Sequence, residues 1–578
     1  MLESSGAPSR GGRGETTLSY IFYGFRYFLW GIRNLLRRLR RPPDYVTFTL
    51  SGEYSEYTLP PGNLIQRRLR PSKASLQELA EQFRSVAADP RVKGVVLHLR
   101  PLEMPQPAIE SLRDLLAELR ASGKRIVAWA SHYVPSSYLV ACAADEIMLQ
   151  PAGEILPLGI RRLYPFLAEA LNQLGMQGDF LPISPYKSAG DMFSRKDMSD
   201  EFRAMANWLM DSAFEERLQS IAAGRRIRME RAREWVDQTP CSDARALEIG
   251  LVDRLLNEED LPQHLGGSAK LTPGGSARLA PWDAARRALR LRPPVRPGKY
   301  VAMIAIEGTI VDGESGRPPI RPPVPVPILL DPRAGDLTVV QAARQVLRDK
   351  RAAAVVVYVN SSGGSATASE AMHSALMRVG SAKPLVVSMG PVAASGGYYV
   401  STPGRHILAQ PSTVTGSIGV LTGKIVMGDL LDRLFINRET LQRGKHTSIY
   451  DAEAPFDDQQ REIIREGVTR VYDVFLERVS TGRKLSREQV DSIGGGRVWT
   501  GRQAMEHRLV DEIGGLERAL AKARQMAGLG PRAPVKLVTA GKQPLAPAAS
   551  PVSYALEGLG LFSSPRPLFL CPFWLHAA

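Results

Sequence analysis

The chain has 578 residues, which is enough for more than one domain with a hydrophobic core of its own. Its hydrophobic content of 44% and charged content of 23% are ordinary for a globular protein. The three cysteines, Cys142, Cys241 and Cys571, are few, odd in number and far apart, so they indicate no disulfide framework and have no metal-ligand spacing; we expect no cofactor. The net charge of +15 would admit nucleic acid or anionic lipid as a partner, but no nucleic-acid motif accompanies it, so we expect no nucleic acid.

The N-terminal part divides into two segments. Residues 1–17 are small, polar and rich in glycine, which predicts disorder. Residues 18–43 predict an amphipathic helix, because polar and basic side chains recur at steps of four and three along Ser19–Arg41 and apolar ones fill the rest. Arg26 and Arg33 interrupt the apolar run before it could span a bilayer, and there is no signal-peptide cleavage site. We expect this helix to lie in a membrane interface, with docking on its own protein or on a partner as the alternative.

The rest of the chain contains a repeat. The sequence DPRVKGVVLHL (89–99) matches DKRAAAVVVYV (349–359), and YLVACAADEIMLQP (138–151) matches YYVSTPGRHILAQP (398–411), both with an offset of 260 positions. We therefore predict a first α/β domain over 44–265 and a second over 299–528. Residues 266–298, rich in Gly, Pro and Arg, predict a linker with a short helical patch at 282–292, and residues 529–578 are expected to form a tail.

The second domain brings two glycine-rich turns together. Two buried strands, over 355–359 and 385–389, are separated by about one helix and end in NSSGG and AASGG. In such a βαβ unit the carboxyl ends of the strands meet, so the amide of Gly364 and the hydroxyl of Ser395 should lie at one edge of the sheet. A glycine pair past a strand can turn a backbone N–H into a cleft as an oxyanion hole requires, and a serine at a strand-to-helix turn can be a nucleophile. The alternative for Ser395 is that it merely caps the helix.

The first domain lacks both features, because Pro135 and Met104 stand at the positions equivalent to Ser395 and Gly364. A nucleophilic serine also needs a base, either a histidine or a neutral lysine. None of the eight histidines suggests a Ser-His-Asp arrangement, although such triads are assembled in space.

The segments 360–370 (NSSGGSATASE), 389–403 (MGPVAASGGYYVSTP) and 411–420 (PSTVTGSIGV) resemble the signal peptide peptidase SppA family in its long tandem-repeat form. This is peptidase family S49, within the crotonase/Clp-like superfamily. The family usually has Pro where Ser362 stands. The resemblance implies an α/β fold of two tandem crotonase/Clp-like domains.

The same resemblance implies the roles of several residues. Lys187, in the YKSA segment 186–189, matches the general-base lysine of the long forms, and Ser417 matches the serine that positions it. The oxyanion would be bound by the N–H groups of Gly364 and Gly396. Lys445 is the alternative base, because short relatives carry serine and lysine in one repeat. A lysine can serve only if burial lowers its pKa enough to leave the amine neutral.

The predicted function is therefore that of a serine endopeptidase that degrades apolar peptides, such as released signal peptides, at a bacterial inner (plasma) membrane. The resemblance also implies a homo-oligomer, as a tetramer. A crotonase-type acyl-CoA enzyme, which would use the same glycine amides on a thioester, and a non-catalytic membrane scaffold are the alternatives. The end of the chain, Pro565–Ala578, contains LFLCPFWL, too short to span a bilayer; it is either a partner- or membrane-facing patch or packed tail.

Overall fold

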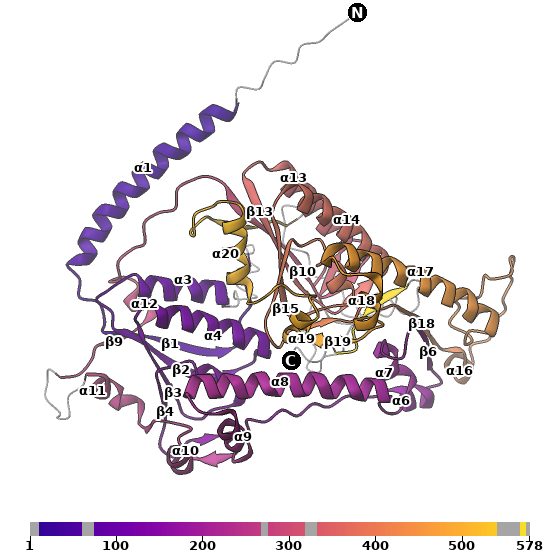
Figure 1. The fold of residues 1–578 in the computed structure, drawn as a ribbon, viewed down its shortest axis with the longest axis horizontal. Coiled ribbons are helices and arrows are strands. Elements are labelled where there is room, and N and C mark those ends of the chain that lie inside the picture. Colours follow the sequence, from indigo (N-terminus) through magenta and orange to yellow (C-terminus); the bar gives the residue numbers. More distant parts are fainter. Residues whose placement is uncertain (1–10, 60–73, 267–274, 318–331, 540–566, 574–578) are drawn as a thin grey trace, which may run out of the picture.

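The computed structural model describes residues 11–59, 74–266, 275–317, 332–539 and 567–573 (Figure 1). The elements up to residue 285 are α1 (Gly11–Arg38), β1 (Tyr45–Gly52), α3 (Leu76–Ala87), β2 (Gly94–Leu102), α4 (Gln106–Ala121), β3 (Arg125–Ala130), α5 (Pro135–Ala141), β4 (Glu146–Leu149), β5 (Glu154–Ile155), α6 (Ala168–Gln173), β6 (Gln177–Pro182), α7 (Asp191–Ser194), α8 (Asp200–Arg225), α9 (Met229–Asp237), β7 (Cys241–Ser242), α10 (Asp243–Ile249), β8 (Arg254–Leu255), α11 (Leu261–Gly266), β9 (Leu279–Pro281) and α12 (Trp282–Ala285). The remaining elements are β10 (Tyr300–Glu307), β11 (Thr309–Val311), β12 (Arg333–Gly335), α13 (Asp336–Arg348), β13 (Ala352–Ser361), β14 (Gly363–Ser365), α14 (Ala366–Ala382), β15 (Leu385–Ala394), α15 (Gly396–Tyr399), β16 (His406–Ala409), β17 (Val414–Gly416), β18 (Leu421–Val426), α16 (Gly428–Arg433), α17 (Asp458–Arg483), α18 (Arg487–Ile493), β19 (Val498–Thr500), α19 (Gly501–Glu506), β20 (Glu512–Ile513), α20 (Leu516–Met526), β21 (Val535–Leu537) and β22 (Leu568–Leu570).

Each repeat is built on a largely parallel sheet. The first has the strand order β8-β4-β3-β2-β1-β9, and the second has the order β19-β17-β15-β13-β10-β21 with β16 and β20 beside β15. The central strands are apolar and buried on both faces, because the helices that connect parallel strands cover the sheet. The two sheets repeat the same plan, since β4 and β16 are offset by the predicted 260 positions. The predicted α/β fold with a tandem repeat is confirmed.

A third sheet joins the two repeats. Its strand order is β12-β11-β14-β22-β18-β6, and β6 comes from the first repeat whereas its neighbour β18 comes from the second. These two strands pair antiparallel from Leu421↔Pro182 to Val426↔Gln177. Helix α8 spans both repeats (Figure 1): its first half lies on the second repeat, where Trp208 stacks on Trp499 with ring centroids 5.2 Å apart, and its end packs in the core of the first. The segment from β6 to the first half of α8 is therefore held against the second repeat.

The predicted linker over 266–298 is only partly a linker. Strand β9 pairs with β1 and extends the first sheet, and the expected helical patch is the short α12. Strand β21 likewise pairs with β10, beyond the predicted end of the second domain. The reason is that β1 and β10 would otherwise be edge strands with unpaired backbone groups. Residues 267–274 of the predicted linker lie outside the described residues.

Helix α1 begins at Gly11, so the prediction of disorder over 1–17 fails for residues 11–17, and the helix ends at Arg38 rather than at 43. Once a helix has nucleated, adding a residue costs little, which allows it to extend into a segment of weak propensity. Residues 1–10 are outside the described part. Within the described residues, no helix has the length and apolar character needed to cross a membrane.

One face of α1 docks on the chain around α12. The indole of Trp30 donates to the carbonyl of Leu291 (2.9 Å), and Arg37 donates to the carbonyls of Arg286 (2.8 Å) and Leu289 (2.7 Å). Part of the polar stripe that was predicted to face lipid headgroups thus contacts the protein itself. The sequence did not indicate this contact, because the partner carbonyls lie about 250 residues away and helical periodicity cannot reveal them.

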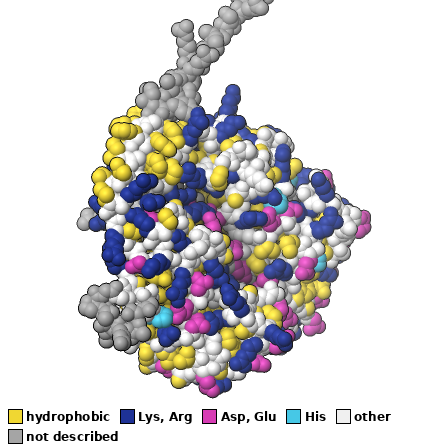
Figure 2. Space-filling view, turned by 60° about the vertical axis from the view of Figure 1, so that its left-hand side comes forward, with side chains coloured by type: hydrophobic (Ala, Val, Ile, Leu, Met, Phe, Trp, Pro, Cys, Tyr) yellow, Lys and Arg dark blue, Asp and Glu magenta, His cyan; other side chains and the backbone are white. Residues whose placement is uncertain are grey.

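The opposite face of α1 remains exposed and apolar. The exposed large side chains are Phe22, Phe25, Tyr27, Phe28, Ile32, Leu35, Leu36 and Leu39. Figure 2 shows hydrophobic side chains gathered near the N-terminal trace, with lysine and arginine side chains beside them. Exposed apolar area of this extent marks an interaction surface.

Candidate active site

Ser395 occupies the turn between β15 and α15. The strand is buried along its whole length, and Ser395 follows as the N-cap of the helix with φ 56° and ψ −114°. A positive φ in a residue other than glycine costs of the order of 1–3 kcal/mol and persists where the surroundings enforce it. Here the Ser395 amide donates to the carbonyl of Gly416 (2.8 Å), and the side chain makes no capping bond to the helix. The predicted strand-to-helix turn is present, and the serine hydroxyl is free of the capping role.

The two predicted oxyanion glycines lie beside one another. Gly364 is in β14, next to Ile310 of β11, and Gly396 is the first residue of α15. A Cβ placed on Gly396 would lie 3.1 Å from the Cα of Gly363 and 3.3 Å from the amide nitrogen of Gly364, so a side chain there would require the neighbouring backbone to shift. Gly364 has φ +150°, a conformation that favours glycine. The structure thus brings both glycines to the edge at which Ser395 lies.

Lys187 reaches the second repeat because β6 delivers it there. The pairing of β6 with β18 continues in the bond from the Ile183 amide to the Val420 carbonyl (2.9 Å). On the other side, Gly496 has φ +95° and a Cβ there would lie 2.6 Å from the Lys187 Cα, so only glycine allows this close packing. The Lys187 side chain is 1% exposed.

The amine of Lys187 contacts three oxygen atoms. Its Nζ lies 2.7 Å from Ser395 Oγ, 2.9 Å from the Ser417 carbonyl oxygen and 2.9 Å from Ser417 Oγ. A neutral amine has two N–H groups and one lone pair. If the two N–H groups donate to the two Ser417 oxygens, the lone pair is left to accept the hydroxyl hydrogen of Ser395. This is the arrangement that a general base requires.

Burial favours the neutral amine. Removal from water lowers the pKa of Lys187 to about 7, because desolvation penalises the charged form. A negative charge on Cys571 would oppose this effect, but burial raises the pKa of the Cys571 thiol to about 11, so the thiol is uncharged at neutral pH. A substantial fraction of Lys187 is therefore neutral near pH 7.

The structure does not bring Lys445 to this cluster. Lys445 is exposed in the loop after α16, and among the described residues its side chain has no hydrogen-bond or ion-pair partner. Two histidines of the strand regions pair with carboxylates elsewhere: His406 lies 2.7 Å from Glu512, and His98 lies 3.2 Å from Glu258. In the described part of the chain, no histidine is within hydrogen-bond distance of Ser395 Oγ.

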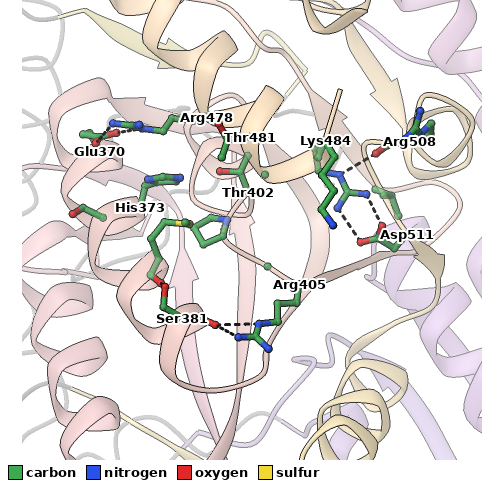
Figure 3. A pocket seen from close by; sticks show the side chains of 18 of the residues that line it. Glu370, His373, Ser381, Thr402, Arg405, Arg478, Thr481, Lys484, Arg508 and Asp511 are labelled. Atoms are coloured by element: carbon green, nitrogen blue, oxygen red, sulfur yellow. Dashed lines mark hydrogen bonds and ion pairs between the residues drawn. The ribbon is translucent and has the colours of Figure 1, made fainter. Parts of the chain in front are cut away.

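One cavity of the second repeat lies apart from this cluster. It has a volume of about 1060 Å³ and is lined by α14, α17 and the turn around Thr402, with Glu370 and Arg478 paired at 2.9 Å on its wall (Figure 3). Neither Ser395 nor Lys187 lines it.

A segment that the sequence analysis did not assign to the site, residues 567–573, packs against the cluster of Ser395, Lys187 and Ser417. Residues 567–573 run past the oxyanion glycines, and Cys571 lies next to Lys187 and Ser417. The continuous apolar run LFLCPF (568–573) is the signal that could have indicated a buried strand there.

Comparison with known proteins gives the family. The sequence model described as "Peptidase family S49" matches residues 118–272 and 378–530, one copy in each repeat. The chain belongs to peptidase family S49. Membership of this family confirms the predicted resemblance and the predicted enzyme class, a serine peptidase.

Individual S49 relatives cover most of the chain. It is 28% identical to "Serine protease SPPA, chloroplastic" of Arabidopsis thaliana over 506 residues, which is 86% of this chain and 71% of that protein. It is 32% identical to "Protease 4" of Haemophilus influenzae over 476 residues, covering 79% of this chain and 74% of that protein. It is 30% identical to "Protease 4" of Salmonella typhi, covering 79% and 72% of the two chains. Neither the acyl-CoA enzyme nor the non-catalytic scaffold is indicated by these relatives.

Proposed function

We propose that this S49 peptidase is a serine endopeptidase with a Ser-Lys dyad divided between its two repeats. Ser395 is the nucleophile, and Lys187 is its general base. The observation that carries the proposal is the 2.7 Å separation of Lys187 Nζ and Ser395 Oγ, between an amine that burial keeps partly neutral and a hydroxyl in a strained turn. Ser417 is the positioning residue, since both of its oxygens hold the amine.

In this mechanism the Ser395 oxygen attacks the carbonyl carbon of the scissile peptide bond and its proton passes to Lys187 Nζ. The negative charge that develops on the carbonyl oxygen is stabilised by the N–H groups of Gly364 and Gly396. The C–N bond then breaks, and the Lys187 ammonium gives its proton to the leaving amine. Lys187 next takes a proton from water, whose oxygen attacks the carbonyl carbon of the Ser395 ester. The ester C–O bond then breaks, Lys187 returns the proton to the Ser395 oxygen, and the second product leaves as the acid.

The substrates are apolar peptides such as released signal peptides. The surroundings of the dyad support this class, because the strand neighbours of β14 and β18 and the adjoining cluster around Phe202 are apolar. The exposed face of α1 supports a place at a membrane surface, with the docked face holding the catalytic domains beside it. By family resemblance that membrane is a bacterial inner (plasma) membrane.

The protein is further proposed to be a homo-oligomer, a tetramer by family resemblance. The chain after α16 supports a subunit contact, because it exposes large apolar side chains. Phe435 is 90% exposed and Leu441 is 94% exposed, with Leu434 and Ile436 beside them. Light scattering on the purified protein tests the subunit number, and replacement of Phe435 and Leu441 by Ser should reduce it.

Replacement of the nucleophile tests the central proposal. Ser395→Ala should lower the cleavage of a soluble apolar peptide by roughly three or more orders of magnitude, as is typical when such a nucleophile is removed. Near-normal turnover of a folded Ser395→Ala protein would show that another residue attacks the peptide bond. The variant is expected to fold, because a small residue suits the turn.

A further inference from the structure

The C-terminal strand β22 is inserted into the third sheet beside the oxyanion loop. It pairs antiparallel with β14 in the register Gly363↔Leu570, Gly364↔Phe569 and Ser365↔Leu568. On its other edge it pairs with β18 at Leu421↔Leu568. The Cys571 amide donates to the Ser362 carbonyl (2.9 Å), and the Ala366 amide donates to the Pro567 carbonyl (3.2 Å). An extended segment is thus bonded along the whole loop that holds Gly364.

The side chains of this segment are divided among three apolar clusters. Phe569 stacks on Tyr399 with centroids 5.1 Å apart and meets Phe475 at 4.7 Å, and Phe573 meets Phe202 at 5.1 Å. Leu568 and Leu570 point to the other side, into a cluster with Leu421 of β18. All of these side chains of the segment are at most 3% exposed.

The fit depends on a glycine. The carbonyl oxygen of Phe569 lies 1.8 Å from where a Cβ of Gly363 would be, and Gly363 has φ +108°. The strand edge of β14 is therefore shaped to let another backbone approach it closely. This is the geometry of β-strand addition, in which main-chain bonds supply affinity and alternate side chains supply specificity.

The segment also packs against the buried catalytic cluster. Ser395 and Ser417 are 0% exposed and Lys187 is 1% exposed. Cys571 lies in the same apolar cluster as Ala394, the residue before Ser395, and its thiol contacts Ser417. A scissile carbonyl has to meet Ser395 Oγ directly, so a peptide cannot react while this segment stays in place.

We propose that residues 567–573 are an inhibitory segment that occupies the substrate groove of its own chain in the manner of a bound peptide. A substrate enters as an extended strand between β14 and β18 and displaces the segment. The groove consequently selects peptides with large apolar side chains at alternating positions. The inference rests on the proposed function in that Ser395 is the nucleophile whose access is blocked.

Thiol labelling tests the displacement without relying on turnover. In Ser395→Ala protein, Cys571 should react with a maleimide at least tenfold more slowly than the half-buried Cys241, as measured by peptide mass spectrometry. Saturating apolar peptide, such as Ac-LFLAAF-amide, should accelerate the labelling of Cys571 at least tenfold and leave Cys241 unchanged. An unchanged rate at Cys571 in the presence of bound peptide would overturn the inference, even if Ser395 is the nucleophile.

Kinetics of the full chain provide the second test. Phe569→Asp should raise kcat/KM for a short soluble peptide at least tenfold, because the apparent rate is reduced by the fraction of chains that are closed. Leu247→Asp, at an apolar side chain exposed on α10, is the matched control and should leave the rate unchanged. Equal rates for Phe569→Asp and wild type, in folded proteins, would contradict inhibition.

Dilution tests whether the inhibitory segment belongs to the same chain as the groove that it occupies. Inhibition within one chain gives a rate per site that is independent of protein concentration. A rate per site that rises on dilution would overturn the assignment to the same chain, since the segment would then come from a second copy. Failure of the proposed function is recognised separately, by activity that survives Ser395→Ala.

Discussion

Replacing Lys187 by Met should change stability in a way that depends strongly on pH. Lysine has an ordinary pKa of 10.5, and burial lowers that of Lys187 to about 7. Between these values the unfolded chain binds more protons at this site than the folded chain, so the stability of the wild type rises with pH. The cost of burying this lysine is about 4 kcal/mol at pH 7 and falls to about 1 kcal/mol at pH 10.

Met is unbranched and apolar, so Lys187→Met removes that cost while filling similar space. It also removes the three contacts of Nζ with Ser395 and Ser417, each worth about 1 kcal/mol. The variant should thus be more stable than the wild type by about 1 kcal/mol at pH 7 and less stable by about 2 kcal/mol at pH 10.

Urea unfolding followed by circular dichroism at the two pH values measures this difference. Lys445→Met, at an exposed lysine, is the control and should change the free energy of unfolding by less than about 0.5 kcal/mol at either pH. A difference between Lys187→Met and wild type that is the same at pH 7 and pH 10 would refute the reasoning, because Lys187 would then titrate alike in both states.

Three further outcomes are expected. The value of kcat/KM for a soluble peptide should rise with pH along a titration with an apparent pKa of about 7 and then level off, because only neutral Lys187 accepts the serine proton; a flat profile from pH 6 to 8 would contradict this. Lys445→Ala should keep turnover within about twofold of wild type, and an inactive variant would move the base to the second repeat. The double variant Phe28→Glu, Leu36→Glu should release the protein from sedimenting anionic vesicles without altering soluble-peptide cleavage, whereas a bound fraction that persists would place the membrane contact elsewhere.

The sequence predicts those residues of the site whose position follows from the local pattern of strands and turns. The positions of Gly364 and Ser395 follow from two buried strands that end in glycine-rich turns, because the carboxyl ends of parallel strands meet. The assignment of Lys187 rested on resemblance alone. Lys187 meets Ser395, 208 positions further along the chain, because β6 pairs with β18, and no local pattern encodes the register of that pairing.

Other parts were missed for similar reasons. The docking of Trp30 depends on a carbonyl 261 positions away, so amphipathic periodicity indicated two faces of α1 but not which one packs on the protein. Strand β22 has only three residues, which is too short a stretch for a strand to be recognised from the sequence pattern. Its pairing with β14 also requires the close approach that Gly363 permits, which only the folded chain reveals.

The central claim is that Lys187 activates Ser395, and a fluorophosphonate probe tests it most directly. Labelling is followed from pH 5.5 to 9 in wild type and in Lys187→Met, and the tagged residue is located by mass spectrometry. The tag should fall on Ser395, at a rate that rises with an apparent pKa of about 7 in the wild type and drops at least a hundredfold in the variant. A tag on another serine, or an equal rate of Ser395 labelling in Lys187→Met, would contradict the claim.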